Sequence, residues 1–175
     1  MNKLSLVAAI AFAAAMMAPA AQAADGTIEF YGAVTGVTCK INQGARDMTV
    51  VLPTVSTDTL KHAGAQAGRT PFVIELTDCD AGAGTVSTVF EGDSHIDANG
   101  NLNIDAGGAA NVQVSLLDEN HKKIKVGFSK KDQDSQQVSV VGGSALLNYY
   151  AQYEATDAAG EGAVVTRVRY SISYE

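Results

Sequence analysis

The sequence predicts an all-β protein with the architecture of a β-sandwich. After residue 23 it contains several short segments in which apolar and polar residues alternate with the period of two that a half-buried strand requires. Glycine and asparagine gather between these segments, and no amphipathic helical pattern of ten or more residues follows residue 23. The last segment is the most regular. One of its faces comprises Val164, Thr166, Val168, Tyr170, Ile172 and Tyr174, and the opposite face comprises Arg167, Arg169, Ser171 and Ser173.

Residues 1–23 have the composition of a signal peptide. Lys3 supplies a positive start, Leu4 to Met17 is apolar, and Ala21-Gln22-Ala23 offers small residues for cleavage. A membrane anchor is the alternative, but an apolar run of about 14 residues is short for a bilayer. Cleavage after Ala23 would leave 152 residues, which suits one domain with a substantial core.

The charge of the mature chain excludes some functions. Without Lys3 it carries 11 basic and 19 acidic residues, a net charge of −8. This balance disfavours nucleic acid as a partner, because phosphates select basic surfaces.

Asp93, His95 and Asp97 lie close together in the sequence, but a polar loop explains them as well as a metal site does. The run from Asp97 to Asn101 resembles a calcium loop, yet Leu102 stands where glycine is required. We therefore expect no enzyme activity and no cofactor.

Cys39 and Cys79 are the two cysteines of the chain. In an exported protein such a pair predicts one disulfide, which would close a loop of about 40 residues and contribute roughly 4 kcal/mol in the chain-entropy model. A reactive or metal-binding thiol pair is the alternative, but it would need neighbouring ligands that the sequence does not place nearby.

Residues 24–35 are predicted to form an arm separate from the domain of residues 36–175. Apolar residues occupy even positions from Ile28 to Val34 and odd positions from Val37 to Ile41. Because side chains alternate with a period of two, this slip turns the apolar face over, and Gly36 provides the necessary break. An apolar strand near a chain end must pair with another strand, and we expect that strand in another molecule.

Further elements are expected between the arm and the last strand. Strands are predicted around Phe72–Leu76, Val86–Glu91, Val112–Leu116 and Leu147–Tyr153, with a short paired strand in Lys122–Phe128. Asn99-Gly100 predicts a hairpin turn, flanked by the apolar residues Leu102 and Ile104. Loops are expected at Thr54–Arg69, with one turn of helix, and at Gln133–Gln137.

Four segments in combination resemble the type 1-like structural pilins of chaperone–usher fimbriae. The arm leads through Gly32 to the first cysteine, and a strand leads to the second. A central strand and a C-terminal strand with a penultimate tyrosine complete the resemblance, which covers essentially the whole mature chain. The segments are Ala24–Cys39, Phe72–Cys79, Val112–Asp118 and Arg169–Glu175.

The resemblance implies an incomplete immunoglobulin-like sandwich that lacks its last strand and is completed by a donated one. A periplasmic chaperone would lend a strand first, and the arm of the next subunit would replace it. In the arm, Ile28, Phe30 and Val34 would fill pockets while Gly32 allows close backbone approach. Burial of the three apolar side chains would contribute roughly 5–9 kcal/mol before entropy costs. The acceptor groove and chaperone contact would include Val168, Tyr170, Ile172 and Tyr174.

The implied partners are the periplasmic chaperone, the outer-membrane usher and neighbouring subunits, and the implied location is a fimbria on the cell surface. A self-contained secreted sandwich that binds a glycan or another ligand is the alternative function, and a periplasmic hydrolase is a third. The sequence leaves open whether the subunit forms the rod, a tip adaptor or a terminator.

Overall fold

The computed structural model describes residues 29, 36 and 38–175. The chain divides into two units, residues 1–35 and Gly36–Glu175. Apart from Glu29, which is exposed, the predicted signal peptide and arm lie outside the described residues. In the part of the chain that the structure describes, no helix is long and apolar enough to cross a membrane.

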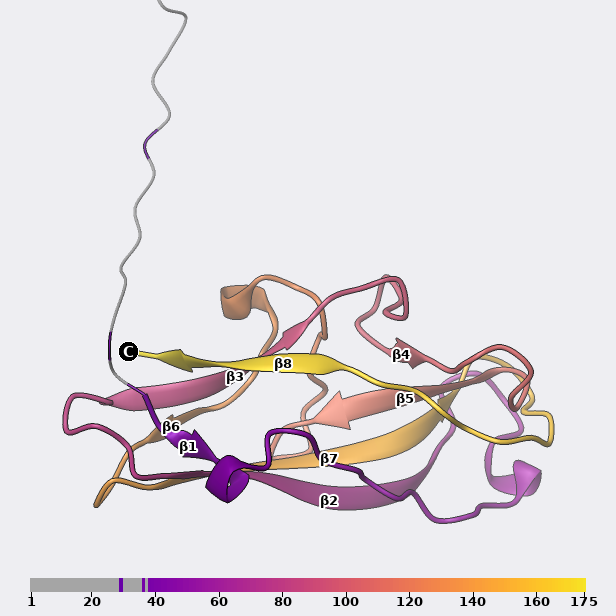
Figure 1. Cartoon of the computed structure of the whole chain (residues 1–175). Helices are drawn as coiled ribbons and strands as arrows, with labels where there is room; N and C mark the ends of the chain where they lie inside the picture. The colour runs from indigo at the N-terminus through magenta and orange to yellow at the C-terminus, as the bar shows by residue number, and fades with distance from the viewer. Residues whose placement is uncertain (1–28, 30–35, 37) are drawn as a thin grey trace, which may run out of the picture. The chain divides into compact units, whose positions relative to one another are not determined.

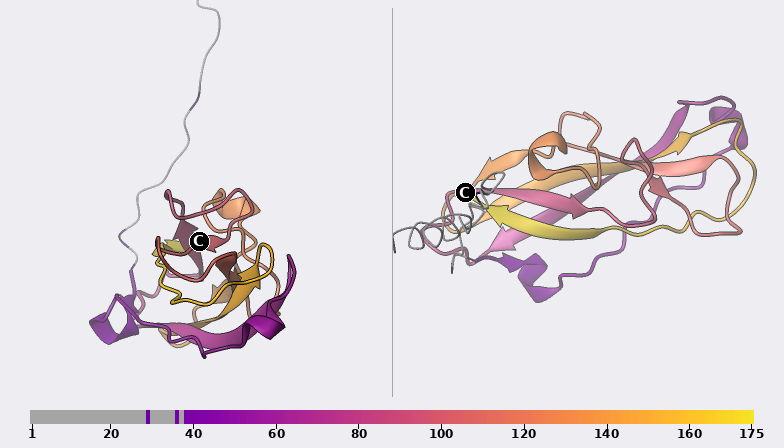
Figure 2. Two further views of the ribbon diagram at one scale, coloured as in Figure 1. Left: turned by 90° about the vertical axis from the view of Figure 1, so that its right-hand side faces the viewer. Right: turned by 90° about the horizontal axis from the view of Figure 1, so that it is seen from above.

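The second unit is built from two antiparallel sheets, which Figures 1 and 2 show as two layers. The predicted all-β sandwich is therefore confirmed, and the helical structure in residues 38–175 is confined to three short 3-10 turns. The strands are β1 (Lys40–Ile41), β2 (Gln66–Thr77), β3 (Thr85–Glu91), β4 (Leu102–Asn103), β5 (Val112–Leu117), β6 (Gln137–Ser139), β7 (Ala145–Ala155) and β8 (Arg169–Tyr174). The turns are η1 (Asn42–Gly44), η2 (Thr57–Thr59) and η3 (Lys130–Asp132).

The order of the strands leaves β8 at the edge of its sheet. One sheet has the order β1-β2-β7-β5-β4 and the other has the order β6-β3-β8. Every neighbouring pair is antiparallel. β8 pairs with β3 along one side, from Glu91 opposite Arg169 to Val86 opposite Tyr174.

The core lies between the sheets because the strands alternate as the sequence predicts. Ile74 and Leu76 of β2 are 1% and 0% exposed, and their β7 partners Leu147 and Ala145 are also buried. Phe90 of β3 meets Tyr149 of β7 edge to face, with ring centroids 5.2 Å apart. This aromatic contact joins the two sheets near the centre of the core.

The segment from Thr54 to Arg69 is more ordered than predicted. It contains the expected helical turn as η2, but β2 already begins at Gln66. The register of β2 against β7 shifts between Ala67 and Thr70, and Gly68 in this bulge has φ +67°. A bulge inserts an extra residue and breaks the period of two, so alternation could not reveal this end of the strand.

The prediction of a paired strand in Lys122–Phe128 is wrong. A single bridge joins Leu117 to Lys123, after which the chain runs as a loop. Ile124 and Val126 are nonetheless fully buried. The N–H of Val126 donates to the carbonyl of Ile124, and Gly127 follows with φ +80°. The apolar alternation here therefore reflects a buried loop.

Gln133 is completely buried, although its neighbourhood is predicted as a polar loop. Its side-chain carbonyl accepts from the N–H of Phe90 at 2.8 Å, and its NH₂ group donates to the carbonyl of Phe90 at 2.9 Å. The amide thus provides Phe90 with the two hydrogen bonds that a neighbouring strand would make. Burial of this polar residue is tolerated because its hydrogen bonds are satisfied.

Candidate functional site

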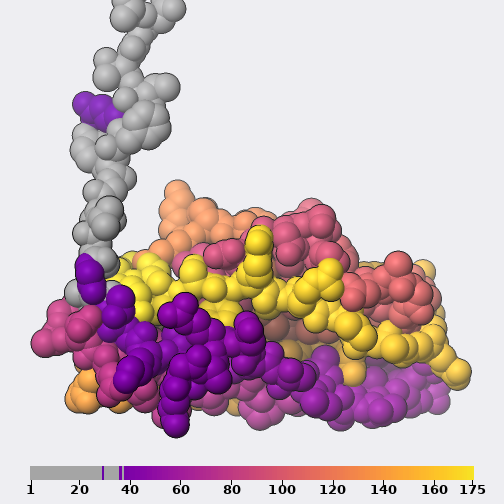
Figure 3. Space-filling model, viewed as in Figure 1, coloured from indigo at the N-terminus to yellow at the C-terminus, as the bar shows by residue number. Residues whose placement is uncertain are grey.

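The free side of β8 faces a segment from the start of the domain. Residues 38–55 run beside β8 on the surface, as the indigo and yellow bands of Figure 3 show. Two hydrogen bonds between these segments confirm that they are neighbours. The phenol oxygen of Tyr174 accepts from the N–H of Cys39 at 3.1 Å, and the phenol of Tyr170 donates to the carbonyl of Arg46 at 2.7 Å.

The inward face of the last segment is only partly covered. Val168, Tyr170, Ile172 and Tyr174 pack against the core but remain half-buried, unlike Ile74 and Leu147, which are at most 1% exposed. Val164 and Thr166, which continue the face towards the N-terminus, are half-buried as well. A strand at the edge of a sandwich has this partial burial when no neighbour covers its far side.

The alternation predicted for this segment extends beyond β8. Val164–Val168 precede the strand. The chain around Ala163 and Val165 is hydrogen-bonded instead to the loop before β5. The carbonyls of Ala163 and Val165 accept from the N–H groups of Ala109 and Asp105. Val168 thus keeps the predicted face without belonging to the strand.

We call residues 38–55, which lie opposite β8, the indigo wall. Within it, the stretch from Arg46 to Val55 is extended and belongs to no strand. Its backbone makes no hydrogen bond with the backbone of another described residue. Val50, Leu52 and Val55 are half-buried, and Val51 is 79% exposed. The backbone edges of β8 and of residues 46–55 therefore run side by side with no described backbone hydrogen bond between them, and the groove is the strip between these two edges. Unpaired edges of this kind are what accept an added strand.

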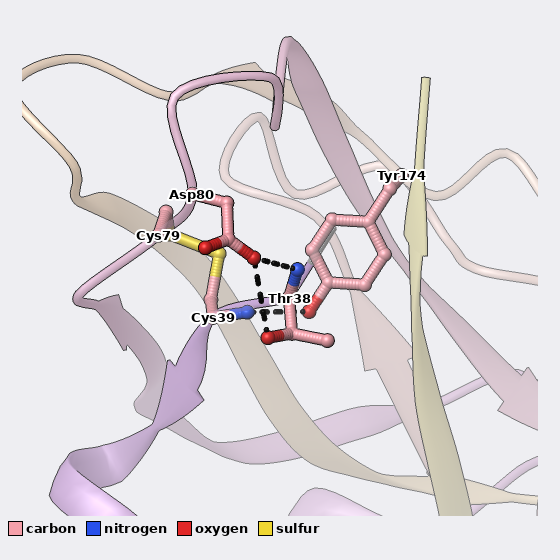
Figure 4. Close-up of a disulfide and its surroundings, with 5 residues drawn as sticks. All are labelled: Thr38, Cys39, Cys79, Asp80 and Tyr174. Atoms are coloured by element: carbon pink, nitrogen blue, oxygen red, sulfur yellow. Dashed lines mark hydrogen bonds between the residues drawn. A yellow bond between two sulfur atoms is a disulfide. The ribbon is translucent and has the colours of Figure 1, made fainter. Parts of the chain in front are cut away.

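Cys39 and Cys79 form the expected disulfide, which anchors the beginning of the indigo wall to the end of β2 (Figure 4). Thr38 and Asp80 reinforce this connection. The N–H of Thr38 donates to the Asp80 carboxylate at 2.7 Å, and the N–H of Asp80 donates to the carbonyl of Thr38 at 3.0 Å. The Tyr174 phenol reaches the same place, so the disulfide, the wall and β8 meet at one end of the groove.

Replacing both cysteines with alanine is expected to lower the free energy of unfolding by about 4 kcal/mol, since a loop of 40 residues is then no longer closed in the unfolded chain. Denaturant titration of the variant and the oxidised wild type measures the difference. Wild-type protein treated with a reductant should match the variant. Two free thiols in periplasmic material would contradict the assignment.

The Tyr170 phenol lies in a partly apolar setting. Burial raises the pKa of this phenol, the Asp47 carboxylate raises it further, and Arg46 opposes both effects. The phenol thus stays protonated at neutral pH and remains a donor to the Arg46 carbonyl.

The acidic cluster around His95 has a structural role in the described residues. One carboxylate oxygen of Asp97 accepts from the N–H groups of Asn99 and Asn101, each at 2.8 Å, which forms the predicted turn. His95 lies 3.4 Å from the Asp105 carboxylate and 3.1 Å from Arg167. Among residues 38–175 no group of three or more potential ligands could hold a metal ion.

The structure is a two-sheet sandwich whose last strand, β8, has a partner strand on one side only. The donor residues predicted for this role, Ile28, Phe30, Gly32 and Val34, lie outside the described residues. The groove residues predicted on the acceptor side are brought together along one edge.

Comparison with known proteins places the chain in a family. The model of the type-1 fimbrial protein A family matches residues 52–175, well over half of the chain. The chain therefore belongs to the type-1 fimbrial protein family. It is a structural subunit of surface fimbriae.

Relatives and solved structures agree with this assignment. The chain is 50% identical over 163 residues to the major fimbrial subunit SMF-1 of Stenotrophomonas maltophilia, covering 89% of this chain and 95% of the relative. It is 37% identical to the F17 fimbrial protein of Escherichia coli over the full length of both chains.

The fold matches a subunit in the structure of a chaperone–usher pilus with a TM-score of 0.62 at 23% identity, covering 90% of this chain and all of the other. The crystal structure of the P pilus rod subunit PapA gives a TM-score of 0.62 at 21% identity, covering 78% and 99%. The predicted immunoglobulin-like sandwich that lacks a strand is thereby confirmed.

Proposed function

We propose that this subunit polymerises by donor-strand exchange, with its groove accepting the arm of the next subunit. The observation that carries the proposal is the pair of open backbone edges along β8 and along residues 46–55. A strand laid between them forms hydrogen bonds on both sides and covers the half-buried faces of Tyr170 and Ile172.

The donated strand comes from residues 24–35 of a neighbouring copy. Ile28, Phe30 and Val34 enter the groove, and Gly32 lies where the arm backbone approaches the acceptor most closely. Residues 1–23 direct export and are removed. A periplasmic chaperone occupies the groove of the new subunit along Val168–Tyr174, and an outer-membrane usher assembles the polymer.

The subunit is a rod component and not an enzyme. The relative with 50% identity is a major fimbrial subunit, which supports the rod over the tip adaptor. A self-contained glycan-binding module would not require the two open edges of the groove.

Replacing Gly32 with valine is expected to impair polymerisation without destabilising the subunit's own domain. The branched side chain forces the donated strand away from the groove and costs about 1–3 kcal/mol of contact energy. Two measurements are paired: the yield of polymer from G32V subunits, and the thermal stability of the G32V domain complemented with a wild-type arm peptide.

The expected result is a lower polymer yield with unchanged stability of the complemented domain. Ala33→Val serves as the matched control, because residue 33 has the opposite parity in the predicted strand and faces away from the groove. Reduced stability of the complemented domain, with normal polymerisation, would instead assign the arm to its own sandwich.

A further inference from the structure

We propose that Tyr170 and Tyr174 are positioning residues that hold the vacant groove at the width of one strand. This inference rests on the proposed function. Each phenol crosses from β8 to the opposite wall, Tyr174 to the N–H of Cys39 and Tyr170 to the carbonyl of Arg46. We call these two side chains the tyrosine rungs.

The length of a rung matches the space that a donated strand needs. An extended tyrosine side chain and one hydrogen bond together span about 9–10 Å, roughly twice the separation of neighbouring strands in a sheet. Walls that such a rung bridges can stand no farther apart than this length, which leaves room for at most one strand that hydrogen-bonds to both. Because the phenol ring is rigid, a rung limits both the widening and the closing of the groove.

The rungs lie below the open backbone edges. Tyr170 and Tyr174 occupy the inward face of β8 and pack against the core, while the backbone edge of β8 lies at the level of the sheet. Figure 4 shows the Tyr174 ring extending from its strand towards Cys39. The donated strand can therefore be seated above the rungs without displacing them.

The indigo wall depends on the rungs because little else fixes its backbone. The disulfide holds its beginning at Cys39, and Leu52 and Val55 pack against the core further along. Between these points the backbone from Arg46 to Val55 has no backbone partner among the described residues. The Tyr170 rung is the described hydrogen bond that ties this stretch to β8.

A groove held at the right width binds a strand faster, because a larger fraction of the molecules is then ready to accept it. When that fraction decreases, the apparent affinity for the strand decreases in proportion. The filled groove needs the rungs less, because the donated strand bonds to both walls. Loss of a rung hydroxyl should therefore slow association and leave dissociation unchanged.

The test uses the mature chain, residues 24–175, diluted from denaturant at a concentration too low for self-association. The probe is a fluorescent synthetic peptide of residues 24–35 in large excess, and stopped-flow anisotropy gives the association and dissociation rates. Tyr170→Phe and Tyr174→Phe remove each hydroxyl and keep the ring. Tyr150→Phe is the control, because Tyr150 lies on β7 and contacts His121, away from the groove.

We expect each rung variant to bind the peptide about three- to tenfold more slowly, the effect of one hydrogen bond, with its dissociation rate within twofold of the wild type. The Tyr150→Phe protein should behave as the wild type. The amide of Cys39 should exchange its hydrogen faster in the vacant Tyr174→Phe protein and regain protection when the peptide is bound. This exchange measurement also shows whether the variant is folded.

Association rates equal to or faster than that of the wild type in both rung variants would overturn the inference. A loss of peptide affinity that comes only from faster dissociation would overturn it as well. Failure of the wild type to bind the peptide at all would overturn the proposed function itself. The two failures are thus distinguishable.

Discussion

Deletion of residues 24–35 is expected to abolish donation by the subunit while leaving its groove able to accept a strand. The described domain begins at Gly36, and its groove lies between segments that the deletion does not touch. Deleted subunits alone should form no polymer. Mixed with wild-type subunits they should end growing chains, so that the mean length measured by electron microscopy falls as their fraction rises.

A separate measurement shows that the deleted subunit is competent. Added arm peptide should raise its thermal stability as much as it raises that of the wild type. Polymerisation of the deleted subunit at wild-type yield would contradict donation by this arm. Failure of the peptide to stabilise it would show that residues 24–35 are needed to fold their own domain.

Replacing both Tyr170 and Tyr174 with serine is expected to prevent recovery of a complex with the periplasmic chaperone. The change removes two half-buried rings from the acceptor face as well as both rung hydroxyls. Loss of this apolar surface costs roughly 2–4 kcal/mol of groove contacts, on top of the hydrogen bonds. Co-purification from periplasmic extracts measures the complex, and the level of processed subunit shows that export is intact.

The matched control replaces Arg167 and Arg169 with serine. These residues alternate with the tyrosines along the same segment but are exposed on its outer face. The control should retain the complex, because the ion pairs of both arginines with Asp105 and Glu91 lie at the surface and contribute little. Wild-type recovery of the complex with the double serine variant would refute the assignment of this face to the chaperone.

Alternation in the sequence predicted the fold well where strands are regular. The face from Val164 to Tyr174 and the core positions of β2 and β7 follow directly from the period of two. Prediction failed where a side chain or a bulge replaces regular pairing. Gln133 serves as a strand partner through its amide, and the bulge at Gly68 hides the beginning of β2. Neither arrangement leaves a periodic pattern.

The site was predictable in part. Alternation identified the inward face of the last segment, which we propose as the acceptor face, and the cysteine pair predicted the disulfide. The opposite wall was not found, because residues 46–55 form no strand and their importance comes from lying beside β8. The rungs were missed for a related reason: a tyrosine in a strand pattern predicts core burial, and nothing nearby in the sequence indicates that its hydroxyl reaches a segment over 120 residues away.

The disulfide has a mechanical consequence for a fimbria under tension. In the proposed polymer each subunit is pulled through its arm, and the load enters the domain at Gly36, three residues before Cys39. The S–S bond carries that load directly to Cys79 and from there to β2, which is paired with β7 along most of its length. Residues 40–78, which include β2 and residues 46–55, form a covalently closed loop, so their backbone cannot be drawn out to lengthen the pulled chain. A pulled subunit therefore cannot lengthen by unravelling the indigo wall, and the groove that holds its neighbour's strand keeps its shape under load.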